Sequence, residues 1–243
     1  MNKIVTLHQP NYLPWIGLFS KVKKSECFII SDDFTYTNHS ETNRNKIRTN
    51  TGWTYLTIPI NRKFHMSRIC NVLLPSDKRW LENHWENIQF HYTKTNFFSL
   101  YRDFFEELYH KDFQYLWELN VEIILYLLKC FEIDVEILKS SDLLDMDNRS
   151  THKTDAIIAI LKAVDAHTYL SGPSGRNYLD YERFPKNNLN LSFFCFQHPV
   201  YPQRYPGFLP NMSAIDLLFN MGPDASRIVA ESGTVEDNVI TST

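Results

Sequence analysis

The feature that most constrains the fold lies within the first 31 residues of the chain. A short apolar run, 4-IVTL-7, is followed by a turn and then by apolar residues at the helical spacing i, i+3, i+4 and i+7, namely Trp15, Leu18, Phe19 and Val22. A second run, 27-CFIIS-31, is short, apolar and rich in isoleucine, which is typical of a buried strand. Strand, helix and strand in this order form a βαβ unit, so the two strands are predicted to lie parallel in one sheet.

The rest of the chain alternates in the same way after a long interruption. The runs 46-KIRT-49 and 53-WTYLTIPI-60 predict a β-hairpin that turns at Gly52. Helical spacing predicts helices over 78–92, 97–110, 114–131, 153–165 and 213–222, and short apolar runs predict strands over 135–140, 168–172 and 190–196. We therefore predict an α/β fold: a Rossmann-like, mostly parallel sheet covered by helices, with a β-hairpin and a helical insertion.

The domain organisation follows from the length and from this pattern. A chain of 243 residues is long enough to bury one large core. We predict a single α/β domain over residues 1–231, with the helical insertion at about 78–131, and a flexible polar tail over 232–243.

Composition and charge exclude several classes of partner. With 25 Lys and Arg against 28 Asp and Glu, the formal net charge is −3, so binding to nucleic acid is not expected. The N-terminal apolar run is too short for a signal peptide, and no run approaches the length of a membrane helix, which predicts a cytoplasmic protein without membrane insertion. The four cysteines stand far apart without CxxC spacing, so neither a zinc site nor disulfides are expected, and no cofactor is predicted.

The candidate site is predicted where the strands end. Ligands of open α/β sheets bind outside the carboxyl ends of the strands. The polar segments that follow the predicted strands are 8-HQPNY-12, 32-DD-33 with 43-NRN-45, 173-PSGRNYLD-180 and 197-QHPVYPQRYPGF-208. In the first segment, Pro10, Pro14 and Gly17 would fix a tight turn that projects His8 and Gln9 over a pocket.

These residues also have structural interpretations. His8 and Gln9 could satisfy buried backbone groups at a sharp turn. Strand alternation would point Asp32 and Asp33 to opposite faces, so they are not expected to share one proton, and either could cap a turn.

The two loops that carry arginines also have both a functional and a structural interpretation. Arg44 offers a planar fork for a carboxylate or phosphate, although 43-NRN-45 could also be a solvated entry to the hairpin. The loop 171-SGPSGRNY-178 could cradle a phosphate with backbone N–H groups, but it lacks the lysine and the spacing of known phosphate loops.

The segment 8-HQPNYLPWIGLF-19 resembles the signature of the WbqC-like family of bacterial proteins. The resemblance continues in order through 28-FIISDD-33, 43-NRNKI-47, 56-LTIPI-60, 169-YLSG-172 with Gly175 and Tyr178, 201-YPQ-203 and 213-SAIDLLFNMG-222. These blocks cover nearly the whole chain. Phe34 and Thr35 stand where a valine and a glutamine are expected, so that edge of the site differs.

The resemblance implies a role in the synthesis of lipopolysaccharide O-antigen or other surface glycans. A nucleotide-linked amino sugar is then the expected small-molecule substrate, together with an acyl or aminoacyl donor. Such a substrate needs donors for its diphosphate and hydrogen-bond partners for its hydroxyls. The predicted substrate-binding residues are Gln9, Asn11, Tyr12, Asn43, Arg44, Asn45, Gly172, Gly175, Arg176, Tyr178 and Gln203.

Three functions remain open: two kinds of group transfer and, from a different class, a noncatalytic role. The leading hypothesis is transfer of an acyl or aminoacyl group to the sugar amine, with His8 as general base and Asp33 or Gln9 orienting it. The second is ATP-dependent adenylyl or nucleotidyl transfer, by fold-level analogy with HIGH-motif enzymes, although this chain has one histidine at that turn rather than two. The third is a noncatalytic module that binds a glycan precursor.

Overall fold

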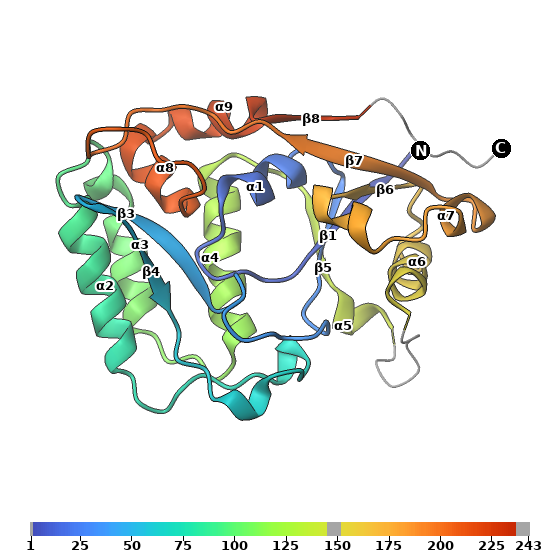
Figure 1. The fold of residues 1–243 in the computed structure, drawn as a ribbon, viewed down its shortest axis with the longest axis horizontal. Coiled ribbons are helices and arrows are strands. Elements are labelled where there is room, and N and C mark those ends of the chain that lie inside the picture. The colour runs from blue at the N-terminus through green and yellow to red at the C-terminus, as the bar shows by residue number, and fades with distance from the viewer. Residues whose placement is uncertain (1, 145–151, 237–243) are drawn as a thin grey trace.

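A computed structural model describes residues 2–144 and 152–236 of the protein. Its central sheet has the strand order β5-β2-β1-β6-β7-β8, in which the first five strands are parallel and β8 is antiparallel to β7 (Figure 1). The strands are β1 (Ile4–His8), β2 (Cys27–Ile30), β5 (Glu136–Lys139), β6 (Thr168–Ser171), β7 (Asn190–Phe196) and β8 (Gly233–Val235). Counted along the chain this order is 3-2-1-4-5-6, the order of a doubly wound Rossmann sheet, which confirms the predicted α/β fold.

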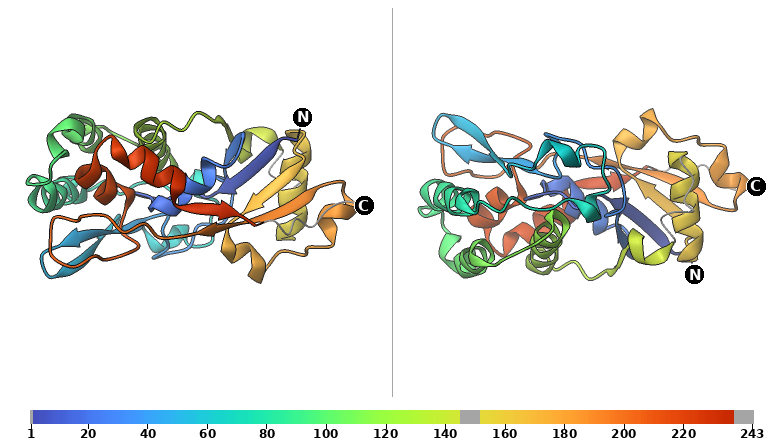
Figure 2. Two further views of the ribbon diagram at one scale, coloured as in Figure 1. Left: turned by 90° about the horizontal axis from the view of Figure 1, so that it is seen from above. Right: turned by 90° about the horizontal axis from the view of Figure 1, so that it is seen from below.

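Both faces of the sheet are covered because its strands carry apolar residues on both sides. Cys27 and Ile29 pack in one cluster with α6 (Lys153–Ala163) and α7 (Arg183–Lys186). The alternate residues, Phe28 and Ile30, pack on the opposite face with α1 (Ile16–Val22). The same cluster includes residues of α8 (Ala214–Met221) and α9 (Asp224–Glu231). Figure 2 shows α6 and α9 on opposite sides of the sheet.

The predicted hairpin and helical insertion lie between β2 and β5 in the chain. The hairpin pairs β3 (Arg44–Thr49) with β4 (Gly52–Thr57) and forms a separate antiparallel sheet beside α2 (Figure 1). The insertion consists of α2 (Arg79–Tyr92), α3 (Phe98–His110) and α4 (Leu116–Cys130), as helical spacing predicted. Among the described residues, the remaining elements include the short helix α5 (Ser140–Leu143) and the 3₁₀ turns Arg62–Phe64, Ile69–Asn71 and Pro173–Asn177. In the described part of the chain, every helix is too short or too polar to cross a lipid bilayer.

The predicted flexible tail begins too early. Residues 233–235 form β8, which pairs with β7 through Phe194–Val235 and Phe196–Gly233. A three-residue strand is too short for its period to be read from sequence, and it is stabilised by the ladder that it adds to the edge of the sheet. The rest of the predicted tail, residues 237–243, lies outside the described residues.

Candidate functional site

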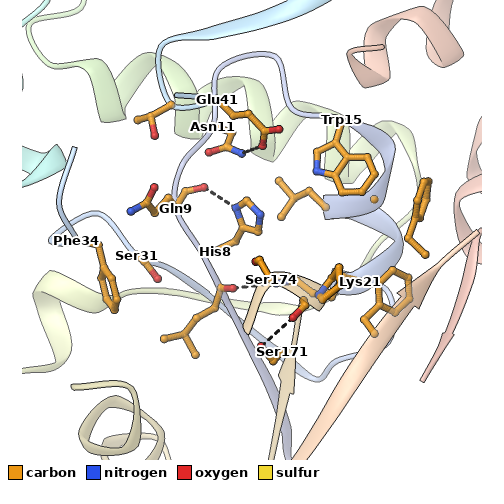
Figure 3. Close-up of a pocket in the computed structure, with 18 of the residues that line it drawn as sticks. His8, Gln9, Asn11, Trp15, Lys21, Ser31, Phe34, Glu41, Ser171 and Ser174 are labelled. Carbon is orange, nitrogen blue, oxygen red and sulfur yellow. Dashed lines mark hydrogen bonds between the residues drawn. The ribbon is translucent and has the colours of Figure 1, made fainter. Parts of the chain in front are cut away.

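A pocket of about 540 Å³ opens at the carboxyl ends of β1 and β6 (Figure 3). These adjacent strands are the point at which the strand order of the sheet reverses, where doubly wound folds bind their ligands. The pocket is lined by residues that follow β1, by α1, and by the Ser171–Ser174 turn after β6. We call it the switch-point pocket.

His8 ends β1 and is half-buried in the wall of this pocket. Its Nδ1 lies 2.9 Å from the Gln9 backbone oxygen. Because a carbonyl oxygen only accepts, Nδ1 carries the proton and Nε2 is left as a hydrogen-bond acceptor. Burial, followed by the nearby charge of Lys21, lowers the pKa of His8 to about 3, so the imidazole is neutral at physiological pH.

Lys21 brings a second nitrogen base into the pocket from the last turn of α1. The residue is only 4% exposed, and its Nζ donates a hydrogen bond of 2.9 Å to the Leu7 backbone oxygen. Burial lowers the pKa of Lys21 to about 7. A large fraction of this amine is therefore unprotonated near neutral pH, with its lone pair available.

Gly17 and Trp15 shape the wall of the pocket at the start of α1. A Cβ on Gly17 would lie 2.3 Å from the Trp15 ring, so only glycine lets the indole fold over the start of α1. The indole then packs edge-on against Phe196 of β7, with ring centroids 4.7 Å apart. This contact ties α1 to the sheet and fixes an aromatic surface in the pocket.

The rim of the pocket is polar. Asn11 Nδ2 donates to Glu41 Oε2 at 3.0 Å, and Gln9 Nε2 donates to the Thr35 backbone oxygen at 3.3 Å. Glu41 is exposed as a residue, and partial desolvation of its carboxyl group raises its pKa. The rim can therefore hydrogen-bond the hydroxyls of a polar ligand.

A second pocket of about 320 Å³ adjoins the first, and Trp15, Ser40 and Glu41 line both. Its other lining residues are His39, Arg44, Asn45, Lys46, Tyr55 and Asn211. We call it the hairpin pocket, because Arg44 to Lys46 belong to β3 and Tyr55 to β4.

Comparison with protein families shows which family the chain belongs to. The model of the WbqC-like protein family matches residues 9–228, a span that includes α1 and most of both pockets. The chain belongs to the WbqC-like protein family. It is also 30% identical over 225 residues to the uncharacterised protein Rv1507c of Mycobacterium tuberculosis (strain H37Rv), an alignment that covers 92% of this chain and 96% of that protein. No solved structure matches the chain.

In this WbqC-like protein, the fold separates the residues predicted from sequence into three groups. The switch-point pocket is lined by His8, Gln9, Asn11, Gly172 and Tyr178. The hairpin pocket is lined by Arg44 and Asn45. Neither pocket is lined by Tyr12, Asp33, Asn43, Gly175, Arg176 or Gln203.

The two aspartates after β2 hold the next element of the fold. The expectation that Asp32 and Asp33 point opposite ways is wrong, because β2 ends at Ile30 and both carboxylates lie within hydrogen-bond distance of the same hydroxyl, Ser140 Oγ. Asp32 also accepts from the Ser141 backbone N–H at 3.1 Å. These bonds hold the start of α5 against the end of β2. His8 is oriented by the Gln9 backbone oxygen.

Gln203 and Tyr12 are parts of buried hydrogen-bond networks in the protein core. Gln203 Nε2 donates to Asp216 Oδ2 at 2.8 Å. Tyr12 is fully buried, and its hydroxyl contacts His84 at 2.8 Å and Tyr109 at 2.6 Å. Both networks connect segments that are far apart in the chain.

The other three residues outside the pockets also have local structural roles. Asn43 Nδ2 donates to the Ile58 backbone oxygen at 2.9 Å, and Arg176 pairs with Glu236 on the surface. A Cβ on Gly175 would lie 2.1 Å from Ser171 Oγ, so this glycine permits a close backbone approach.

Sequence reasoning missed Lys21 and Glu41. The signal for Lys21 is its place on the apolar stripe of the first helix, three residues after Leu18 and four after Gly17, where a charged residue is unusual. The sequence gives no such signal for Glu41, because this residue lies in a turn and only the tertiary fold brings it to the pocket. Within residues 2–144 and 152–236, no group of three or more His, Cys, Asp or Glu side chains is arranged to hold a metal ion.

Proposed function

We propose that this WbqC-like protein transfers an acyl or aminoacyl group to the amine of a nucleotide-linked amino sugar during the synthesis of a bacterial surface glycan. The observation that carries the proposal is Lys21, a buried lysine in the switch-point pocket whose pKa is lowered to about 7. Amide formation needs an amine without its extra proton, and a base with a pKa near the working pH serves that step best.

Lys21 is the base in this step. The sugar nitrogen attacks the acyl carbon, a C–N bond forms, and the bond to the leaving group of the donor breaks. The leaving group departs with the electron pair, and Lys21 Nζ takes the proton from nitrogen. This assignment moves the role of base away from His8, because a pKa of about 3 makes its imidazole a weak base.

His8 then orients the acceptor. Its Nε2 is an acceptor held in place by the bond between Nδ1 and the Gln9 backbone oxygen. A sugar N–H or O–H that donates to Nε2 would be positioned beside Lys21, whose charge acts on the same ring. The size of the pocket, about 540 Å³, lies within the usual range for small ligands, about 300–1,000 Å³.

The test measures product formation by mass spectrometry. The protein is incubated with a UDP-linked amino sugar that has a free amine, and with either an acyl-CoA or an amino acid plus ATP as donor. We expect a product with the mass of the amide, and at least a 10²-fold lower kcat for Lys21→Met. In the wild type, kcat/KM should fall tenfold per pH unit below about 7, as Lys21 becomes protonated.

The control is Lys23→Met, which removes an exposed lysine two residues later. His8→Asn is expected to raise KM more than it lowers kcat, since His8 is assigned to orientation. Full kcat in Lys21→Met would remove Lys21 from the mechanism.

Adenylyl or nucleotidyl transfer is the second candidate. It is favoured by the doubly wound strand order together with a histidine at the end of the first strand. Release of pyrophosphate from ATP, with the sugar gaining the mass of a nucleotide and no amide formed, would favour this candidate over acyl transfer.

A further inference from the structure

We infer that the hairpin pocket is a second substrate subsite, which binds the negatively charged end of a cosubstrate, a phosphate or a carboxylate, between Arg44 and Lys46. The inference rests on the proposed function, because it assigns the hairpin pocket to the acyl or aminoacyl donor. The binding itself is a property of the hairpin and can be measured without any reaction.

The two cations stand on one face of the hairpin because of strand alternation. Arg44 and Lys46 are two residues apart on β3, and Lys46 is paired across the ladder with Tyr55 of β4. The Arg44 guanidinium lies 4.3 Å from the centre of the Tyr55 ring, and Lys46 Nζ lies 4.4 Å from that of Trp53. Aromatic faces hold both cations without neutralising them.

Neither cation has a carboxylate in salt-bridge contact among the residues that the structure describes. Elsewhere on the surface, most of the arginines and lysines that form ion pairs have a carboxylate partner within a few residues along the chain. Arg48, next on the same face of β3, differs again, because its guanidinium is buried and donates to the backbone oxygens of Thr49, Gly52, Pro206 and Gly207. Arg48 therefore fixes the hairpin, while Arg44 and Lys46 are left facing the pocket.

The position of the hairpin pocket suits a cosubstrate. It shares Trp15, Ser40 and Glu41 with the switch-point pocket, so a molecule anchored at Arg44 could extend toward the acceptor. Burial raises the pKa of Glu41, and the positive charge of Lys46 offsets part of this rise, as expected for a carboxylate that lies near this cation. Two cations with one carboxylate favour an anion at the hairpin end and disfavour one at the junction.

The experiment uses pyrophosphate and acetate as probes, titrated into the full chain at constant ionic strength and followed by isothermal calorimetry. We expect saturable binding of at least one probe, and at least tenfold weaker binding in Arg44→Gln and in Lys46→Gln. Arg44→Lys keeps the charge and is expected to retain more affinity than Arg44→Gln. Tighter binding of pyrophosphate would identify a phosphate end, and tighter binding of acetate a carboxylate end.

Two controls locate the bound anion. Lys63→Gln removes an exposed cation that also lies over an aromatic ring, that of Phe64 at 5.0 Å, but outside both pockets, and it should bind as the wild type does. Lys21→Met tests whether the anion enters the switch-point pocket instead. The inference is overturned if neither probe binds, if Arg44→Gln and Lys46→Gln bind normally in folded protein, or if only Lys21→Met loses binding. None of these outcomes depends on turnover, so they leave the proposed reaction to its own test.

Discussion

At the scale of single residues, Lys21 combines a cost to stability with a use in chemistry. Its amine is enclosed by the wall of the switch-point pocket, and its one hydrogen bond in the described structure is to the neutral oxygen of Leu7. Burial without a counter-charge disfavours the ammonium form, which is the reason that its pKa falls from 10.5 to about 7. If this side chain served only for packing, a methionine would fill the same space without the cost of burying an amine. The burial of Lys21 therefore favours a chemical role.

This shift predicts how stability depends on pH. The folded pKa of Lys21 is about 7 and the unfolded value is 10.5, so between these values the folded protein binds fewer protons than the unfolded chain. Its contribution to the free energy of unfolding therefore rises with pH across this window and is most unfavourable at and below pH 7. Lys21→Met should melt at a higher temperature than the wild type near neutral pH, and the gain should shrink as the pH approaches 10.

Melting temperatures of both proteins measured from about pH 6 to about pH 10 test this expectation. Lys23→Met, which alters an exposed lysine, should show a difference from wild type that does not vary with pH over this range. A Lys21→Met difference that is equally flat would mean that Lys21 titrates normally.

At the scale of elements, Asp216 joins three segments that are distant in the chain. It lies in the first turn of α8, is fully buried, and burial raises its pKa. Its Oδ1 accepts from the Tyr92 hydroxyl at 3.0 Å, and its Oδ2 accepts from the Tyr201 hydroxyl at 2.9 Å and from Gln203 at 2.8 Å. The helical insertion, the loop around 201–203 and α8 are thus held by one carboxylate.

Removing this carboxylate should destabilise the fold strongly. Asp216→Ala removes the carboxylate that accepts from the buried hydroxyls of Tyr92 and Tyr201 and from the partly buried amide of Gln203, and we expect a loss of about 3–5 kcal/mol in the free energy of unfolding. Asp216→Asn keeps one oxygen acceptor and should lose less. Urea denaturation measures both, with Asp224→Ala at the exposed start of α9 as the control, for which about 1 kcal/mol or less is expected. Equal losses in Asp216→Ala and Asp224→Ala would show that the network contributes little.

At the scale of the whole molecule, the bounds of the helices and strands were more predictable from sequence than the tertiary contacts of their side chains. The strands and helices that were predicted from local periodicity agree with the structure within a few residues, whereas α5, α7, α9 and β8 were not predicted. Of the candidate site residues predicted at strand ends, His8 and Gln9 line the switch-point pocket. Gln203 and Arg176 lie outside both pockets, because Asp216 and Glu236, the side chains that they contact, are brought close to them only by the tertiary fold.

The same reasoning explains why the sequence predicts a pocket at the strand ends but does not predict which residues line the switch-point pocket. Strands separated by more than 150 residues of chain, β1 and β6, become neighbours only when the order of the sheet is known. Alternation predicts a parallel sheet but does not set its order, and the burial of Lys21 depends on that order. Residue types at strand ends therefore predicted that there is a site, and the topology decided which side chains share it.

This topology predicts a ligand footprint in two distant parts of the sequence. If a nucleotide-linked amino sugar binds in the switch-point pocket, amide hydrogen exchange should slow both near residues 8–12, after β1, and near 171–175, after β6, because both segments wall the same cavity. At about 100 times its Kd the ligand should also raise the free energy of unfolding by about 2.7 kcal/mol. Exchange in α3, which lies away from both pockets, is the internal control. Pyrophosphate should instead protect the hairpin, and protection by the sugar nucleotide that is confined to the hairpin would contradict its assignment to the switch point.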